Sequence, residues 1–451
     1  MKTYTLTMDF LCPVHIGTGE EIDPFYFTIK GNELILVDTE RWLVDESENQ
    51  DLLDKFIKLD FIGLRKFVAE SIPVDKYAKA RIPVKSSRLV NDYKNAVLQG
   101  KNPLNQVLLN LLPRSSASGR PFIPGSSIKG SMRTALGSIV AQHVGVKKND
   151  RIREYNKKIF GDIREDRFRH VKVSDAPLSG LRTSIVSGDE VSKNMNRKAG
   201  TPKGHFEVTP SLCWAEGPYT VKSKFMWEDF KLPSLTGTIT LDVMIKALNK
   251  FYIPKYMKEL KEFYSLSHLN MVGRKLDKVT SIVNSINQQK PEGNALMRIG
   301  HFSHLECMTF DRMRNPRGKY GTTRTLANKE IPFGWVKISF EQGYEPQELS
   351  DAEYVTTVRE VPSGHKPSTA RTKEEITEDR LNSLIMQLDN MQTSKMPGML
   401  PQLARNILSS EDTAYRQKAS QIVLERIKNR GMKKKFKAKD WFKELKKLNQ
   451  Q

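Results

Sequence analysis

The sequence contains few cysteines and no long apolar run. Only three of its 451 residues are cysteine, and Cys12, Cys213 and Cys307 lie far apart in the chain. An odd number of widely spaced thiols does not make a disulfide framework, so we expect a reducing, cytoplasmic setting. Nowhere do about 18 uncharged apolar residues follow one another, and the first residues alternate as a strand does, so we expect neither a membrane span nor a leader.

Acidic residues are also scarce relative to basic ones. The chain has 73 Lys and Arg against 52 Asp and Glu, a net charge of +21, and a pI near 9.6. Residues 346–451 contain 20 basic and 14 acidic residues, so 15 of the excess positive charges lie on residues 1–345. This excess predicts a polyanionic partner, and nucleic acid fits best. A membrane surface is disfavoured because no basic amphipathic helix with a broad aromatic face dominates the chain.

Two periodicities predict the secondary structure. Alternation predicts strands at 3–11, 25–29, 33–37, 170–174, 205–209, 237–245 and 334–340. Helical spacing predicts helices at 52–70, after Pro124 as far as Val144, at 254–264 and at 276–289. Groups of strands separated by single helices are typical of an α+β protein. The Gly-, Ser- and Lys-rich segment 187–204 has neither period and is expected to be a long loop.

The composition changes after residue 345. Residues 362–373 have the composition of a linker, and apolar residues at helical spacing follow at 374–391. A further helix is expected from Ser409, whose spacing to Asp412 matches a capping box, to Gly431 as a C-cap. Lysines interleave with aromatic residues at 436–448. We therefore expect residues 346–451 to form a basic helical extension.

The segment Phe122–Arg133 is the strongest candidate for binding phosphates. Its residues Gly125, Ser126 and Ser127 stand where the helix after Pro124 begins, and a helix start presents unpaired N–H groups to anions. Either serine can cap this helix. Gly125 and Gly130 allow another backbone to approach, and Lys129 and Arg133 lie four residues apart to contact consecutive phosphates. An ordinary capped helix with two surface cations explains the pattern equally well.

Two glycine-containing turns supply further candidates. Gly17 follows the first strand, next to His15; a lone histidine there is more often structural than a base or an RNA contact. Asp23 is either catalytic or, more simply, a capping residue.

The segment Arg298-Ile-Gly-His combines the cation of Arg298 with the turn at Gly300, and the rings of His301 or Phe302 can stack on a base. The spacing of His301, His304 and Cys307 could suit zinc, but no second ligand pair is nearby, so we expect no metal or other cofactor.

The string IPGSSIKGSMR, preceded by VHIGTG and followed by FGD and VSD, resembles the RAMP superfamily of CRISPR proteins. The segment TRTLANKEIPFGWVKI at 323–338 looks like the end of one branch, the fifth subunit of the type III-A (Csm) effector complex. The likeness covers about residues 1–340. It departs from the family at 298–304, where histidines replace later glycines of a glycine-rich loop.

This resemblance implies the domain plan and the function. It implies two ferredoxin-like (RRM-like) RAMP domains, at 1–205 with a helical insertion and at 206–345, before the extension at 346–451. It also implies a non-catalytic subunit that caps the filament at the 3′ end of the crRNA, near target RNA and the repeated backbone subunit, and that supports crRNA maturation, with host nucleases trimming the 3′ end. The alternative is a RAMP-type endoribonuclease that uses His15 or Asp23 on guide precursor or target RNA; such an enzyme needs a positioned base and acid, which the sequence does not supply.

Overall fold

The computed structural model describes most of the chain as two compact units, Met1–Thr357 and Val358–Gln451. It describes residues 1–344 except 59, 102–104, 145–151, 163, 196–202, 215–216, 289–292 and 309–320. Farther on, it describes 381, 384–385, 388, 400–401, 403–404, 407–408, 410, 412–432, 436 and 439–448. The predicted linker at 362–373 lies outside the described residues.

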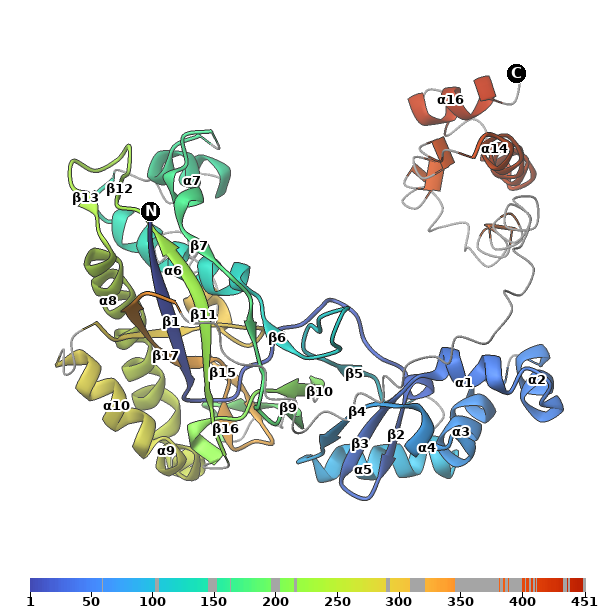
Figure 1. Ribbon diagram of the computed structural model, residues 1–451, viewed down its shortest axis with the longest axis horizontal. Coiled ribbons are helices and arrows are strands. Elements are labelled where there is room, and N and C mark those ends of the chain that lie inside the picture. The colour runs from blue at the N-terminus through green and yellow to red at the C-terminus, as the bar shows by residue number, and fades with distance from the viewer. Residues whose placement is uncertain are drawn as a thin grey trace. The chain divides into compact units, whose positions relative to one another are not determined.

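A five-stranded sheet lies in the part of the first unit drawn at the left of Figure 1. The first strand, β1 (Lys2–Phe10), pairs antiparallel with β11 (Thr220–Trp227) on one side and with β17 (Trp335–Gln342) on the other. The sheet order is β14-β17-β1-β11-β7, with β14 at Ala295–Arg298 and β7 at Lys172–Val173. The strands predicted at 3–11, 170–174 and 334–340 are thus confirmed. In β1, the burial of alternate side chains fixes the register of its pairing with the neighbouring strands.

Two long helices pack together against this sheet. The helix expected after Pro124 is α6 (Gly125–Val140), and it packs against α8 (Leu241–Glu259), which also contacts β14. Figure 1 shows α8, α9 (Asn270–Lys275) and α10 (Asp277–Asn287) beside the sheet. Their apolar side chains and those of the strands make one continuous core. Packing against α8 and the sheet therefore fixes the position of α6.

The strand predicted at 237–245 is wrong. Only Thr238–Ile239 is extended, as β13, and the helix α8 begins at Leu241, well before the helix predicted to start at Pro254. The hydroxyl of Thr240 accepts a hydrogen bond from Val243 N and caps the helix. The sequence GTITLDVMI satisfies the strand period and a helix start equally, and packing of Met244 and Leu248 against the core decides for the helix.

A second sheet has the order β16-β15-β9-β10-β5. Its strands are β5 (Leu109–Asn110), β9 (Ser184–Ser192), β10 (Gly204–Val208), β15 (Thr323–Ala327) and β16 (Ile331–Pro332). The loop predicted at 187–204 is therefore wrong in its first part, where β9 pairs with both β10 and β15. Cross-strand pairing over small polar residues leaves no apolar alternation to detect. Each sheet contains strands from before and after residue 205, so the sheets do not separate at that point. The domain boundary expected at 205/206 stays a prediction.

The N-terminal hairpin and its helices form a smaller layer of the first unit, at one side in Figure 1. The strands β2 (Phe27–Lys30) and β3 (Glu33–Val37) pair through a turn at Gly31, as predicted, and β4 (Ala78–Pro83) extends their sheet. The helices predicted at 52–70 are confirmed as two. The helical segments here are η1 (Pro24–Tyr26), α1 (Thr39–Asp45), α2 (Gln50–Ile57), α3 (Phe61–Ser71), α4 (Val74–Tyr77), α5 (Ser87–Tyr93) and η2 (Lys94–Leu98).

Shorter elements connect these layers. They are β6 (Phe122–Ile123), α7 (Ile152–Phe160), η3 (Arg167–His170), β8 (Ala176–Pro177), η4 (Leu212–Trp214), β12 (Phe230–Lys231), η5 (Leu260–Tyr264), η6 (Ser267–Leu269) and α11 (His304–Met308).

The second unit has its own apolar core. Its fully described helices are α14 (Thr413–Asn429), which matches the helix predicted from Ser409 to Gly431, and α16 (Asp440–Leu448), which lies in the stretch 436–448 of the predicted helical extension. The cap of α14 is Asp412, whose carboxylate accepts from Tyr415 N. The capping box from Ser409 therefore placed the N-cap three residues early, while Gly431 has the positive φ of a helix C-cap. Most of 374–391 lies outside the described residues.

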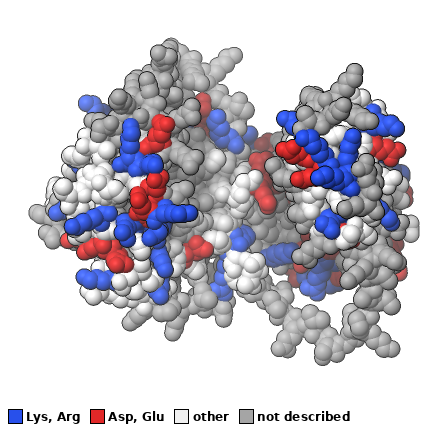
Figure 2. All heavy atoms as spheres, turned by 90° about the horizontal axis from the view of Figure 1, so that it is seen from above, with Lys and Arg blue, Asp and Glu red and all other residues white. Residues whose placement is uncertain are grey.

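The charged surface is mixed. On the face drawn in Figure 2, basic side chains lie interspersed with acidic ones instead of forming one unbroken stripe. Among the described residues, no helix combines the length and the apolar character that crossing a bilayer requires.

Candidate nucleic-acid interface

Three segments that the sequence singled out separately meet at one hollow of about 530 Å³ in the first unit. They are the turn after β1, the first three turns of α6, and the turn after β14. The described residues that line it are His15, Ile16, Gly17, Gly19, Asn110, Ser127, Gly130, Ser131, Thr134, Arg298, Gly300, His301, Ser303, Cys307 and Met308. None of these lining residues is acidic, so the hollow does not repel an anion.

Backbone hydrogen bonds hold the two turns together. His301 N donates to His15 O at 2.8 Å, and Gly334 N donates to Pro13 O at 2.9 Å. Gly300 has a φ of +91°, and a Cβ there would lie 2.3 Å from His15 O. Only glycine allows this approach. The function of Gly300 is therefore to let two turns of this chain touch, and its own backbone is packed against the protein.

His15 is almost completely buried, and its ring is fixed by neighbours. Its Nδ1 lies 2.8 Å from Glu207 O, and its ring packs edge-on against Phe206 with centroids 5.0 Å apart. Burial lowers the pKa of His15 to about 4, while the hydrogen bond to Glu207 opposes this shift. The ring is thus neutral at physiological pH. It can act as a hydrogen-bond acceptor, and its low pKa makes it a weak general base.

Arg298 does not present its charge to the hollow. Its side chain is 2% exposed, and Nη1 lies 2.7 Å from Glu259 Oε2, while Nε donates to Phe333 O at 2.9 Å. Arg324 Nε lies 2.9 Å from the other oxygen, Glu259 Oε1. A buried carboxylate thus already neutralises this charge, and the contact of Arg298 with RNA stays a prediction. The sequence missed Glu259, since an acid within a mixed-charge helical segment resembles an ordinary surface residue.

The start of α6 is already occupied by an anion of the protein itself. Gly125 is buried, its N donates to Asp175 Oδ1 at 2.8 Å, and a Cβ at this position would lie 2.1 Å from Val173 O. Neither Ser126 nor Ser127 caps the helix with its side chain. The predicted amide site at Gly125 is thus filled, and the predicted serine caps are wrong. Ser127 instead faces the hollow, and Ser126 is exposed outside its lining.

Lys129 and Arg133 face away from the hollow. Arg133 Nη1 lies 2.7 Å from Asp166 Oδ2, and its guanidinium stacks 3.7 Å from the centroid of Phe160. Lys129 Nζ lies 5.8 Å from the ring of Phe168, and burial with nearby cations lowers the pKa of Lys129 while Asp166 opposes the shift. The structure therefore does not bring this pair together with the other candidates. A spacing of four residues places Lys129 and Arg133 on one face of α6, but in the folded protein both side chains pack against aromatic rings.

Gly130 is accessible from solvent, in contrast to Gly125. It is exposed on α6, and a Cβ there would meet nothing within 4 Å. Ser127, Ser131 and Thr134 lie on the same face one turn apart and complete a polar wall. The sequence did not single out Ser131 or Thr134, although their spacing from Ser127 would have identified them. A glycine in mid-helix costs about 1 kcal/mol relative to alanine, and its packing inside this protein does not require it.

The catalytic and metal candidates are not assembled. Asp23 accepts from Phe25 N at 2.9 Å as a cap and forms an ion pair with Arg65, which matches the simpler interpretation. It does not line the hollow with His15. Within the described ranges, no group of three His, Cys, Asp or Glu side chains could hold a metal ion. Cys307 is buried and His304 is half-buried, and both lie close to Arg298.

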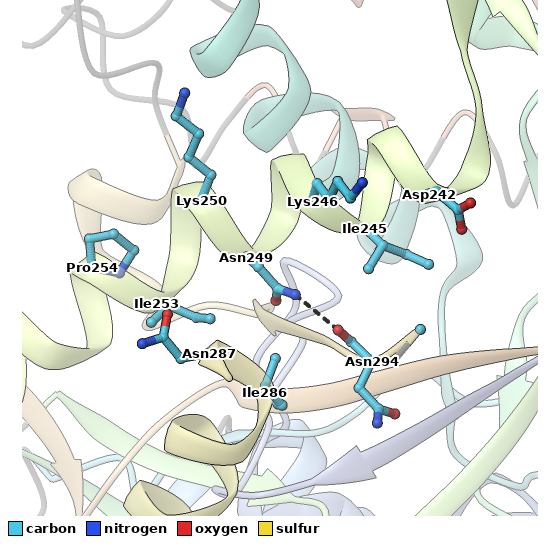
Figure 3. A pocket seen from close by; sticks show the side chains of 11 residues that line it. Asp242, Ile245, Lys246, Asn249, Lys250, Ile253, Pro254, Ile286, Asn287 and Asn294 are labelled. Atoms are coloured by element: carbon cyan, nitrogen blue, oxygen red, sulfur yellow. Dashed lines mark hydrogen bonds between the residues drawn. The ribbon is translucent and has the colours of Figure 1, made fainter. Parts of the chain in front are cut away.

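A groove of about 450 Å³ between α8 and α10 is lined by none of the predicted site residues (Figure 3). Asn249 on its floor donates to Asn294 O at 2.9 Å and accepts from Leu296 N at 2.9 Å. Figure 3 shows this amide directed at the start of β14. Asn249 therefore helps to fix the strand that ends at the hollow.

Comparison with known proteins gives related matches. A family model described as RAMP superfamily matches residues 7–311. The chain is similar to the "CRISPR system Cms protein Csm5" of Streptococcus thermophilus, with 24% identity over 221 residues. That match covers 46% of this chain and 61% of the relative, so this chain spans less than two thirds of its length.

Two solved structures are also similar. One chain of a Csm–crRNA–target RNA ternary complex, from a type III-A CRISPR-Cas system, has a TM-score of 0.53 at 18% identity, covering 75% of this chain and 100% of that chain. A crystal structure of T. onnurineus Csm5 has a TM-score of 0.48 at 19% identity, covering 73% and 99%. The first likeness shows a shared fold, and the predicted mixture of helices and sheets is confirmed.

Proposed function

This chain belongs to the RAMP superfamily, and on that premise we propose that it is a non-catalytic RNA-binding subunit of a type III-A CRISPR effector complex. It holds the crRNA in the hollow and caps the filament at the 3′ end of the guide. Its partners are the crRNA, nearby target RNA, the repeated backbone subunit and other Csm subunits. Host nucleases trim the 3′ end during crRNA maturation in the cytoplasm. The likeness to Csm5 and to a chain of a Csm–crRNA–target RNA complex supports this assignment to antiviral defence.

One observation carries the RNA-binding part of the proposal. Segments around residues 15, 130 and 300 meet at an open hollow whose described lining has no carboxylate. Small residues cover much of that lining, so the main chain of this protein is close to any ligand. An extended polyanion with a narrow backbone fits such a surface, and the net charge of +21 attracts it.

The charges that attract RNA lie outside the hollow. Arg298 is neutralised by Glu259, and Lys129 and Arg133 pack against aromatic rings. The hollow therefore positions the strand through neutral polar groups, while surface cations supply the salt-dependent affinity. Each phosphate that they neutralise contributes about 0.7 to the log-log salt slope for a single strand.

Replacing Gly130 by phenylalanine is expected to lower the affinity for single-stranded RNA at least about tenfold, because the ring fills the open space on α6. Filter binding of short RNA to the full-length chain at several salt concentrations measures this change. The salt slope should stay close to that of the parent, since no cation is removed.

Two variants separate this effect from general damage. Asn284→Phe adds the same ring to an exposed position of α10 and should bind RNA as the parent does. Gly130→Ala should raise the free energy of unfolding by about 0.5–1 kcal/mol, because a helix favours alanine, yet it should not improve binding. Parental affinity in Gly130→Phe would show that RNA does not lie in the hollow.

The endoribonuclease alternative is tested with the same preparation. The unmodified protein, incubated with guide precursor RNA with and without EDTA, is expected to leave the RNA intact, because Asp23 is paired with Arg65 away from His15. Gel analysis of end-labelled RNA measures cleavage. Product formation that disappears in His15→Ala or Asp23→Ala would establish the enzyme instead.

A further inference from the structure

His15 carries one ring nitrogen whose protonation the structure fixes. Its Nδ1 lies 2.8 Å from Glu207 O, and a carbonyl oxygen can only accept, so Nδ1 carries the hydrogen. A neutral imidazole has one N–H, so Nε2 presents a lone pair. This assignment follows from the partner alone.

This nitrogen lies beside Gly17, at the lining of the hollow. A Cβ placed on Gly17, which lines the hollow, would lie 3.5 Å from His15 Nε2. None of the hydrogen bonds between described residues involves this nitrogen. The ring cannot turn away, because Phe206 and His301 contact it with centroids 5.0 and 6.1 Å distant. The hollow therefore has a rigid acceptor that requires a donor from its occupant.

A nucleic acid offers two main kinds of donor, the N–H groups of its bases, which RNA and DNA share, and the ribose 2′-OH, which only RNA has. Phosphate oxygens carry no hydrogen at neutral pH, and a deoxyribose presents no hydroxyl at C2′. A ribose 2′-OH both donates and accepts, and it is the group that distinguishes RNA from DNA. Gly17, Gly130 and Ser127 line the same hollow, and because they have a small side chain or none, a sugar-phosphate backbone can approach closely.

Resting on the proposed function, we propose that His15 Nε2 accepts a hydrogen bond from a ribose 2′-OH and makes the hollow selective for RNA over DNA. Ser127 and Ser131 line the same hollow and offer hydroxyl donors to the oxygen of that group. His15 is then a specificity-determining residue. Its role is different from that of a base in RNA cleavage.

The test compares one sequence with three sugars on the full-length chain. RNA, 2′-fluoro RNA and DNA are titrated by filter binding; fluorine keeps an RNA-like sugar but cannot donate a hydrogen bond. We expect the unmodified protein to bind RNA about 3- to 10-fold more tightly than 2′-fluoro RNA, which is the effect of one hydrogen bond. Equal affinity for RNA and 2′-fluoro RNA would overturn the proposal while leaving RNA binding intact. Failure to bind any of the three would overturn the proposed function itself.

A variant identifies the residue. His15→Asn keeps an N–H close to Glu207 O but is too short to supply the acceptor at the position of Nε2, so the ratio should fall to about 1. A ratio that stays parental in a folded His15→Asn, checked by its thermal melt, would overturn the role of His15. If that variant does not fold, equal affinity of the unmodified protein for RNA and 2′-fluoro RNA still overturns the proposal, because this comparison needs no substitution.

Discussion

Replacing Glu259 by alanine is expected to lower the free energy of unfolding by about 3–5 kcal/mol, because it leaves two buried guanidinium groups without their shared carboxylate. Glu259 is 3% exposed; its oxygens lie 2.7 Å from Arg298 Nη1 and 2.9 Å from Arg324 Nε, and Tyr264 OH donates to it at 2.9 Å. Burial by itself would raise the pKa of Glu259, but Arg298 and Arg324 outweigh it and hold the pKa below its usual value.

Removal of the Glu259 carboxylate would affect Arg298 and Arg324 differently. Arg324 keeps an ion pair with Glu306 at 3.3 Å, whereas Arg298 keeps the Phe333 carbonyl and the face of Trp335. Arg298 ends β14 and leads into the turn at Gly300, so the loss should disorder that side of the hollow and weaken RNA binding as well.

Urea unfolding of the full-length chain at neutral pH measures the effect. Glu262→Ala is the matched control: this acid lies three residues away, is partly exposed and pairs with Lys193 and Lys258, so its loss should cost less than about 1 kcal/mol. A change in Glu259→Ala no larger than in the control would mean that the buried cluster does not stabilise the fold.

Acidification from about pH 7 to about pH 5 is expected to lower the free energy of unfolding by about 2 kcal/mol for each of three histidines with lowered pKa values, at 1.36 kcal/mol per pKa unit. Burial lowers the pKa of His15 and His205 to about 4 and that of His304 to about 2. Arg88 adds to the shift of His205, and Arg298 and Arg324 add to that of His304, while nearby acids oppose both.

The direction of this effect follows from proton binding. The unfolded chain takes up protons near pH 6.5, whereas the folded chain does not until the pH approaches the lowered values, so stability is complete above about 6.5 and falls below it. Glu259 and Glu306 also have lowered pKa values, so their contribution is lost only as the pH falls below the ordinary glutamate value of 4.5. As the pH falls, protonation of the histidines therefore lowers the free energy of unfolding before protonation of the glutamates does.

Urea unfolding midpoints between about pH 7.5 and about pH 5 test this. The triple replacement of His15, His205 and His304 by asparagine or glutamine should flatten the decline, and replacement of the exposed His268 should not. A parental decline in the triple variant would show that other groups control the acid response.

Local patterns in the sequence determined much of the secondary structure. The alternation of β1, the turn at Gly31 and the apolar spacing of α6 each depend on a few neighbouring residues, and each was predicted. Where two periods fitted, as at the start of α8, or where polar residues paired across strands, as in β9, only packing decided.

The candidate site divided in the same way. The sequence by itself identified three segments, and the structure brings all three to one hollow. Only the tertiary structure decided which charges are free, because Arg298, Arg133 and the amide of Gly125 are paired with Glu259, Asp166 and Asp175. Those acids lie 33 to 50 residues away along the chain, and a Coulomb interaction depends on distance in space, which no local pattern encodes.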